Sequence, residues 1–97
     1  MKKKKVNFKA DFFKELEDPE SAEIYLNDAM EGGDIQAILL AIRDIAKVRG
    51  VAEIAKKTGI QREHLYTMLS EHGNPTLDSF SSIMGALGYE LQVKRRA

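Results

Sequence analysis

The chain has 97 residues, of which 43% are hydrophobic and 31% charged. This size fits one small globular domain and is too short for a Rossmann or barrel enzyme. The chain has no cysteine, which excludes disulfide bonds, cysteine-based zinc sites and thiol catalysis. Its longest apolar run, residues 37–42, is far shorter than the roughly 20 residues that a membrane span needs.

The formal net charge is zero, but the charges are unevenly distributed. Residues 1–10 carry five lysines and no acid, residues 11–44 carry a net charge of −8, and residues 45–97 carry +3. This asymmetry suggests different partners for the two surfaces, although charge runs are often only solvated faces. No apolar stretch follows the lysine run 2–5, so we expect no secretory signal and a cytoplasmic protein.

Residues 1–17 are basic and then mixed in character, with aromatic side chains at Phe8, Phe12 and Phe13. The pattern is compatible with a loose arm, a short strand or a segment docked on the rest of the protein. We therefore divide the chain into an N-terminal arm, 1–17, and a single folded domain, 18–97.

Two helices are expected next. Asp18-Pro19 combines a capping side chain with the proline favoured in a first helical turn, and the glycine pair 32–33 ends this helix. Its apolar positions are Ile24, Leu26 and Met30.

Asp34 caps the second of these helices, which should run to Arg49. Ten of the 14 residues from 35 to 48 are apolar, which is typical of a central core helix.

Three helices and one strand are expected in the remaining half. Residues 51–58 and 62–70 form two short helices around Gly59. Thr76 caps a third helix, which runs to Leu87. Residues 89–93 alternate between apolar and polar side chains, which is typical of a strand with one buried face. Because a lone strand is unstable, it should pair with the N-terminal segment or with the same strand of a second subunit.

The spacing around Gly59 predicts a helix-turn-helix motif at about 51–70. Ala55 is small enough to let two helices cross closely, and the glycine allows the positive φ of the turn. Ile60 and Leu65 fill the angle between the helices. In this motif the second helix enters the major groove of DNA.

Residues 54–88 resemble the lambda-repressor/Cro-like (Xre-type) helix-turn-helix domains. Two segments, 61–70 (Gln-Arg-Glu-His-Leu-Tyr-Thr-Met-Leu-Ser) and 73–75 (Gly-Asn-Pro), are similar to elements of the addiction module antidote family. With the helix start at 18–20, the resemblance covers about residues 12–93. It implies an all-α fold, a lambda-repressor-like five-helix bundle, to which the alternating segment adds a short C-terminal β-strand.

The resemblance implies the antitoxin of a type II toxin–antitoxin pair, which represses its own operon and neutralises a RelE/HigB-like ribonuclease. Two alternatives stay open, a stand-alone Xre-type repressor without a toxin and an interaction module that has lost DNA binding. His64 and His72 are the only histidines and have no converging ligands at zinc spacing. We expect no enzyme activity, no catalytic residue, no metal and no cofactor.

The resemblance also implies contacts with double-stranded DNA. Arg62 and Glu63 would reach base edges, since arginine pairs with guanine and glutamate accepts from cytosine. Thr67 lies one turn further on the same face. Gln61 matches a capping or phosphate-contact position. Arg62 and Glu63 are equally compatible with ordinary surface charges.

Lys56, Lys57 and Asn74 are candidate phosphate contacts, although the lysines can be merely solvated and the asparagine can merely shape its turn. Tyr66 is a further candidate, but aromatic residues at helical spacing usually pack in the core, so packing is favoured over DNA contact. Many Xre-type domains begin the first motif helix with glutamine. This chain has Gly50-Val51-Ala52 there, so we expect that contact to be absent.

For the toxin, the candidate apolar anchors are Phe12, Phe13 and Leu16, beside acidic side chains that suit the basic surface of an RNA-binding protein. The same three residues are equally suited to covering the core. On the first interpretation, a chain lacking residues 1–17 still folds and binds DNA but no longer neutralises the toxin. We also expect a homodimer, because one recognition helix contacts few base pairs and half-sites lie about 34 Å apart.

Overall fold

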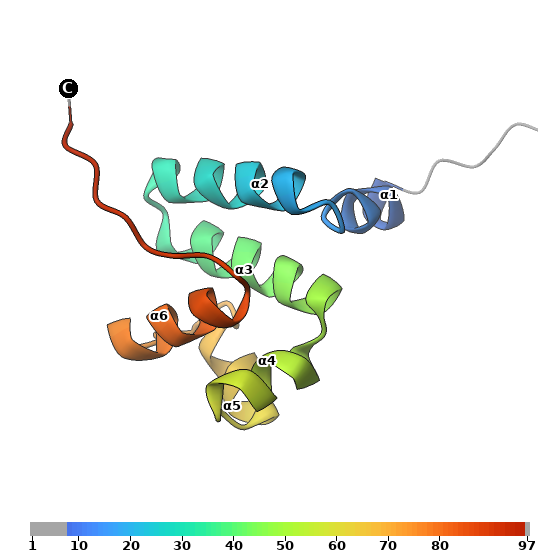
Figure 1. The fold of residues 1–97 in the computed structure, drawn as a ribbon, viewed down its shortest axis with the longest axis vertical. Coiled ribbons are helices and arrows are strands. Elements are labelled where there is room, and N and C mark those ends of the chain that lie inside the picture. The colour runs from blue at the N-terminus through green and yellow to red at the C-terminus, as the bar shows by residue number, and fades with distance from the viewer. Residues whose placement is uncertain (1–7, 97) are drawn as a thin grey trace, which may run out of the picture.

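The computed structural model describes residues 8–96, and their regular structure is entirely helical (Figure 1). Five of the helices lie where the capping residues and glycines predict them, whereas α1 lies in the segment that the sequence leaves undecided. The lysine run 2–5 falls outside the described residues. The helices are α1 (Phe8–Glu15), α2 (Pro19–Gly32), α3 (Ile35–Arg49), α4 (Val51–Thr58), α5 (Arg62–Met68) and α6 (Leu77–Ala86).

The predicted capping residues act as helix caps. The Asp18 carboxylate accepts a hydrogen bond from the backbone N–H of Ser21 at 3.1 Å, at the start of α2. The Thr76 hydroxyl oxygen accepts one from the backbone N–H of Ser79 at 3.1 Å, at the start of α6. These bonds satisfy N–H groups that have no partner inside the helix, which is why the helices begin where they do.

α3 is the central helix, as its composition predicts. It packs against α1 and α2 on one side and against α4 on the other (Figure 1). Its apolar side chains are buried over most of its circumference, so this one helix supplies much of the core. The buried apolar residues of α3 are Ile38, Leu39, Ala41, Ile42, Ile45 and Ala46.

The prediction of a five-helix bundle with a C-terminal β-strand is wrong. The described residues form six helices and contain no strand. One predicted partner for the strand was the N-terminal segment, but its residues 8–15 form α1 instead. Without a neighbouring strand, the backbone groups of residues 90–96 make no hydrogen bond to other backbone groups of the described chain.

The apolar alternation from Tyr89 to Val93 does not mark a buried face. Tyr89 packs against the core, and its N–H donates to the Met84 carbonyl at 2.9 Å. Leu91 is 41% exposed and Val93 is fully exposed. The segment is therefore fixed at its first residue and then crosses the surface beside α2.

α1 is docked on the core. Leu16, directly after this helix, is only 2% exposed and is among the largest fully buried side chains. Phe12 is half-buried and meets Tyr25 edge-on, with ring centroids 5.1 Å apart, and Phe13 packs beside it at 5.6 Å. Deleting residues 1–17 would therefore remove part of the core, so this truncation cannot separate toxin binding from folding.

A hydrogen bond between two side chains joins α2 to α3. The Tyr25 hydroxyl donates to the Asp44 carboxylate at 2.9 Å, and Asp44 is the one buried charged residue among those described. Burial is the largest effect on the pKa of Tyr25, and the hydrogen bond and negative charge of Asp44 add to it. Together they raise this pKa to about 12. The hydroxyl therefore keeps its proton, and the buried carboxylate keeps its donor, at neutral pH.

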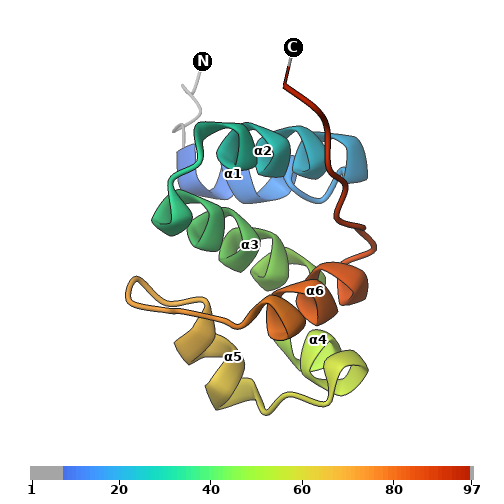
Figure 2. The same cartoon turned by 90° about the vertical axis from the view of Figure 1, so that its left-hand side faces the viewer.

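The layers give the molecule two distinct ends. α1 and α2 lie at one end of its long axis and α4 and α5 at the other, with α3 and α6 between them (Figures 1 and 2).

Over residues 8–96, no helix has the length and apolar character needed to cross a membrane. The same residues contain no cluster of three His, Asp or Glu side chains arranged to hold a metal ion.

Candidate nucleic-acid interface

The α4–α5 pair is joined by a tight turn that begins at Gly59. This glycine has a φ of +76°, a conformation that is costly for other residues, and its N–H donates to the Ala55 carbonyl at 2.9 Å. The Thr58 hydroxyl oxygen accepts a hydrogen bond from the N–H of Ile60 at 3.2 Å. These bonds fix the direction in which the chain leaves α4 and enters α5.

Apolar side chains hold the two helices together, as the spacing predicts. Ile54 of α4 and Leu65 of α5 are 2% and 1% exposed. Ile60 and Ala55 are half-buried and pack against the same core. Burial of this inner face leaves the opposite face of α5 turned to solvent.

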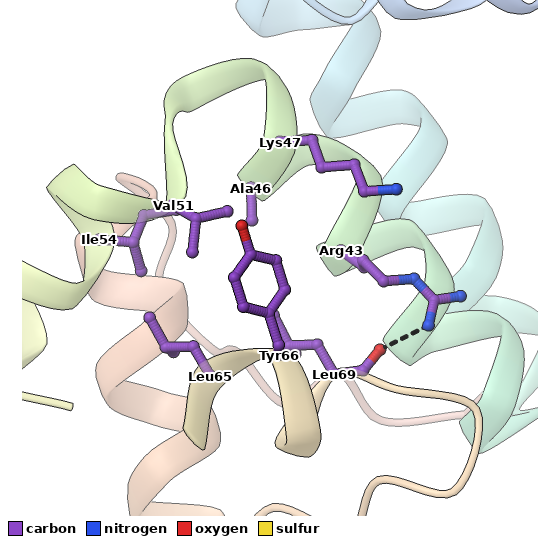
Figure 3. A pocket seen from close by; sticks show the side chains of 8 residues that line it. All are labelled: Arg43, Ala46, Lys47, Val51, Ile54, Leu65, Tyr66 and Leu69. Carbon is purple, nitrogen blue, oxygen red and sulfur yellow. Dashed lines mark hydrogen bonds between the residues drawn. The ribbon is translucent and has the colours of Figure 1, made fainter. Parts of the chain in front are cut away.

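Arg43 fixes the far end of α5. Its Nη1 donates to the backbone carbonyl of Leu69 at 2.9 Å, which satisfies a carbonyl at the C-terminus of α5 and ties it to α3 (Figure 3). Sequence reasoning missed this role. The available signal was one arginine in the middle of an otherwise apolar helix.

Most of the predicted DNA contacts lie on the exposed surface. Thr67 has a restricted role, because its hydroxyl donates to the Glu63 carbonyl at 3.0 Å and only its lone pairs remain free. In the described part of the chain, the charged candidates form no ion pair with another side chain. The exposed candidates are Lys56, Lys57, Gln61, Arg62, Glu63, Thr67 and Asn74.

The structure groups these candidates unevenly. Arg62, Glu63, Tyr66 and Thr67 share the short helix α5, and the two lysines stand in the last turn of α4, just before the connecting turn. Asn74 lies in the loop that follows α5, so the whole length of that helix separates it from the turn. One compact set of polar and basic side chains therefore forms around the N-terminal half of α5.

Tyr66 is both packed and exposed. Its side chain is 46% exposed, yet its ring stands against α3 and α4, between Val51 and Arg43 (Figure 3). The pocket around it has a volume of about 10 Å³, which is the room of roughly one water molecule. This pocket is a gap in packing and is too small for a ligand.

Lys47 is a basic residue that the sequence reasoning did not select. It is exposed and lines the same pocket as Tyr66, one helical turn after Arg43 (Figure 3). Lys47 therefore adds a basic side chain on α3 to the surroundings of Tyr66. The signal for it was an i, i+4 pair of basic residues, Arg43 and Lys47, in a mostly apolar helix.

Comparison with known proteins places the whole described chain in one family. Residues 6–95 match the family described as "Probable addiction module antidote protein". An uncharacterized protein of Haemophilus influenzae is 39% identical to this chain over 85 residues, which cover 88% of each of the two chains. No solved structure matches the chain.

The same substitution, glycine to alanine, should have different effects on stability at two positions. Gly59→Ala places a side chain at a φ of +76° and should lower the free energy of unfolding by about 1–2 kcal/mol. Gly32→Ala, in the last turn of α2, has open space and no positive φ, so it should leave stability unchanged or raise it by up to about 1 kcal/mol.

Urea unfolding followed by circular dichroism measures both variants under one set of conditions. Equal effects of the two substitutions would contradict the assignment of Gly59 to a left-handed turn.

Proposed function

We propose that this chain, which belongs to the family of probable addiction module antidote proteins, is the antitoxin of a type II toxin–antitoxin pair. The family match over residues 6–95 carries this proposal. The chain acts in the cytoplasm by binding, and not as an enzyme. Its protein partner is a RelE/HigB-like ribonuclease, whose RNA-binding surface must be basic because it holds a phosphate backbone.

Growth rescue tests the antitoxin function. The probe is the protein encoded by the reading frame next to this gene, expressed from an inducible promoter. Its expression alone should arrest growth, and co-expression of this chain should restore growth. The control is the same gene with a stop codon in α3, which removes the protein and keeps the transcript. A neighbour that does not arrest growth, or an arrest that this chain does not relieve, would refute the proposal.

The second activity is repression of the chain's own operon. The α4–α5 pair acts as a helix-turn-helix, with α5 in the major groove of operator DNA. Arg62 and Glu63 are exposed and unpaired on this helix, while Gly59 and Arg43 fix its two ends. The backbone of α5 is therefore fixed before binding, and only the side chains of Arg62 and Glu63 have to be ordered when they reach base edges.

The operator is bound by a homodimer. The recognition helix α5 has only 7 residues, so one copy reaches few base pairs. Two copies related by a two-fold axis would read half-sites about 34 Å apart, which doubles the DNA contacts without a second kind of DNA-binding surface.

A stand-alone repressor would share this DNA binding but would fail the growth-rescue test.

Two substitutions separate base contacts from phosphate contacts. Arg62→Ala should weaken operator binding by about 1–3 kcal/mol per subunit and relax the preference at one base pair. Lys57→Ala should weaken binding to operator and to unrelated DNA about equally and reduce the salt dependence by about one charge.

Arg49→Ala is the matched control, since Arg49 is exposed on α3 and outside the candidate set. It should leave both affinities unchanged. Fluorescence anisotropy with labelled duplexes at several salt concentrations measures all three variants. Operator affinity that survives both the Arg62 and the Lys57 substitutions would place the DNA-binding surface elsewhere.

A further inference from the structure

The outer face of α2 carries negative charge that forms no ion pair within the described chain, although Arg49 lines one pocket together with Glu20 and Glu23. Residues 15–42 include eight acidic residues and no lysine or arginine. All eight are exposed, and four of them, Glu20, Glu23, Asp28 and Glu31, lie on α2. None of these four forms an ion pair or hydrogen bond with another described residue. Their charge is therefore available to a partner.

This arrangement is locally unfavourable for α2. Glu20 and Glu23 are three residues apart, as are Asp28 and Glu31, and like charges at this spacing repel on a helix. The last turn contains Glu31 and no basic residue, although the C-terminal end of a helix dipole favours positive charge. A surface that breaks these local rules and forms no ion pair inside the described chain favours compensation from a binding partner.

Ile24 is an exposed apolar residue that lies among these acidic side chains. It is 56% exposed, although its position in the sequence suggested a core residue, and it lies one turn from both Glu20 and Asp28. We call Glu20, Glu23, Ile24, Asp28 and Glu31 the acidic ridge. A large exposed isoleucine ringed by charges has the composition of a binding hot spot, in which an apolar centre is surrounded by a polar rim.

A groove runs along one flank of the acidic ridge. It has a volume of about 760 Å³ and lies between α2 and residues 88–92. The buried side chains of Leu26 and Met84 contribute to its apolar lining, and its charged lining residues are Glu23 and Glu90. A basic side chain suits such a groove, because its aliphatic stem can cover apolar surface while its charged end meets a carboxylate.

The charge of the ridge selects among possible occupants. A second copy of this chain in a two-fold contact would bring the ridge against itself, so that like charges would face each other. Nucleic acid and anionic lipid would be repelled in the same way. A protein with a basic surface is the occupant that the ridge attracts.

We propose that the acidic ridge is the docking surface for the basic, RNA-binding face of the toxin, an inference that rests on the proposed antitoxin function. Ile24 contacts an apolar site on the toxin, and the carboxylates around it meet lysine and arginine side chains. The ridge therefore covers the surface with which the toxin holds RNA. Because α2 and α5 lie at opposite ends of the molecule, the docked toxin leaves α5 free (Figures 1 and 2).

Paired charge reversals test the ridge. The doubly substituted variant Glu20→Lys/Asp28→Lys should weaken binding to the protein encoded by the neighbouring frame by about 100-fold, because like charges then face each other. The variant Glu71→Lys/Asp78→Lys changes the net charge by the same amount at exposed positions outside the ridge. It should change the affinity by less than about threefold, since screening weakens the effect of distant charges.

A second pair tests the apolar anchor. Ile24→Ser should weaken toxin binding by about tenfold. Leu77→Ser is its control, because Leu77 is an exposed apolar residue of α6, 77% accessible and outside the ridge. Circular dichroism checks that each full-length variant is folded.

The outcomes distinguish the two levels of the proposal. Loss of binding in both ridge variants with retention in both controls supports the ridge. If the wild-type chain binds the toxin and the ridge variants bind equally well, the ridge is overturned while the antitoxin function stands. If the wild-type chain does not bind the neighbouring protein at all, both the function and the ridge are refuted.

Discussion

The burial of α3 on both sides is the constraint on which the rest of this structure depends. A helix that is apolar around most of its circumference cannot be covered by a single neighbour. α1 and α2 cover one side and α4 covers the other. Each large apolar side chain that is fully buried contributes roughly 1.5–3 kcal/mol, so this shared core holds together the helices on its two sides. The result is a molecule with two distinct ends joined by one helix.

Two neighbouring residues of α3 connect these ends. Asp44 accepts the hydrogen bond of Tyr25 from α2, and Arg43 donates to the Leu69 carbonyl at the end of α5. The acidic end and the end that carries Arg62 are therefore anchored to adjacent points of the same helix. The proposed function needs one surface for a basic protein and one for DNA, and this arrangement provides an acidic and a basic surface at separate ends of a chain of 97 residues.

Local signals in the sequence were sufficient for the helices from α2 to α6. Asp18, Asp34 and Thr76 all accept the predicted capping bonds, and Gly59 has the predicted positive φ. The prediction of a C-terminal strand was wrong for a physical reason. An alternating pattern shows which side chains share a face, but a strand also needs a backbone partner, and that partner is a property of the whole fold.

The proposed toxin surface was harder to predict, because it depends on which side of a helix faces the core. In α2 the sequence offered Ile24, Leu26 and Met30 as equivalent apolar positions, but only Leu26 is buried. The reverse holds in the N-terminal segment, where Leu16, a predicted toxin anchor, is a core residue. Docking of α1 explains this difference, and α1 is too short to show a long apolar period that would reveal it in the sequence.

The independence of the two ends is tested most directly by the mass of a three-component complex. The chain, the protein encoded by the neighbouring frame and an operator duplex would be mixed at micromolar concentration and analysed by size-exclusion chromatography with light scattering. Separate surfaces on α2 and α5 predict one species that contains toxin, DNA and two copies of this chain. Displacement of the DNA by the toxin, with no three-component species at any ratio, would contradict the two-ended arrangement.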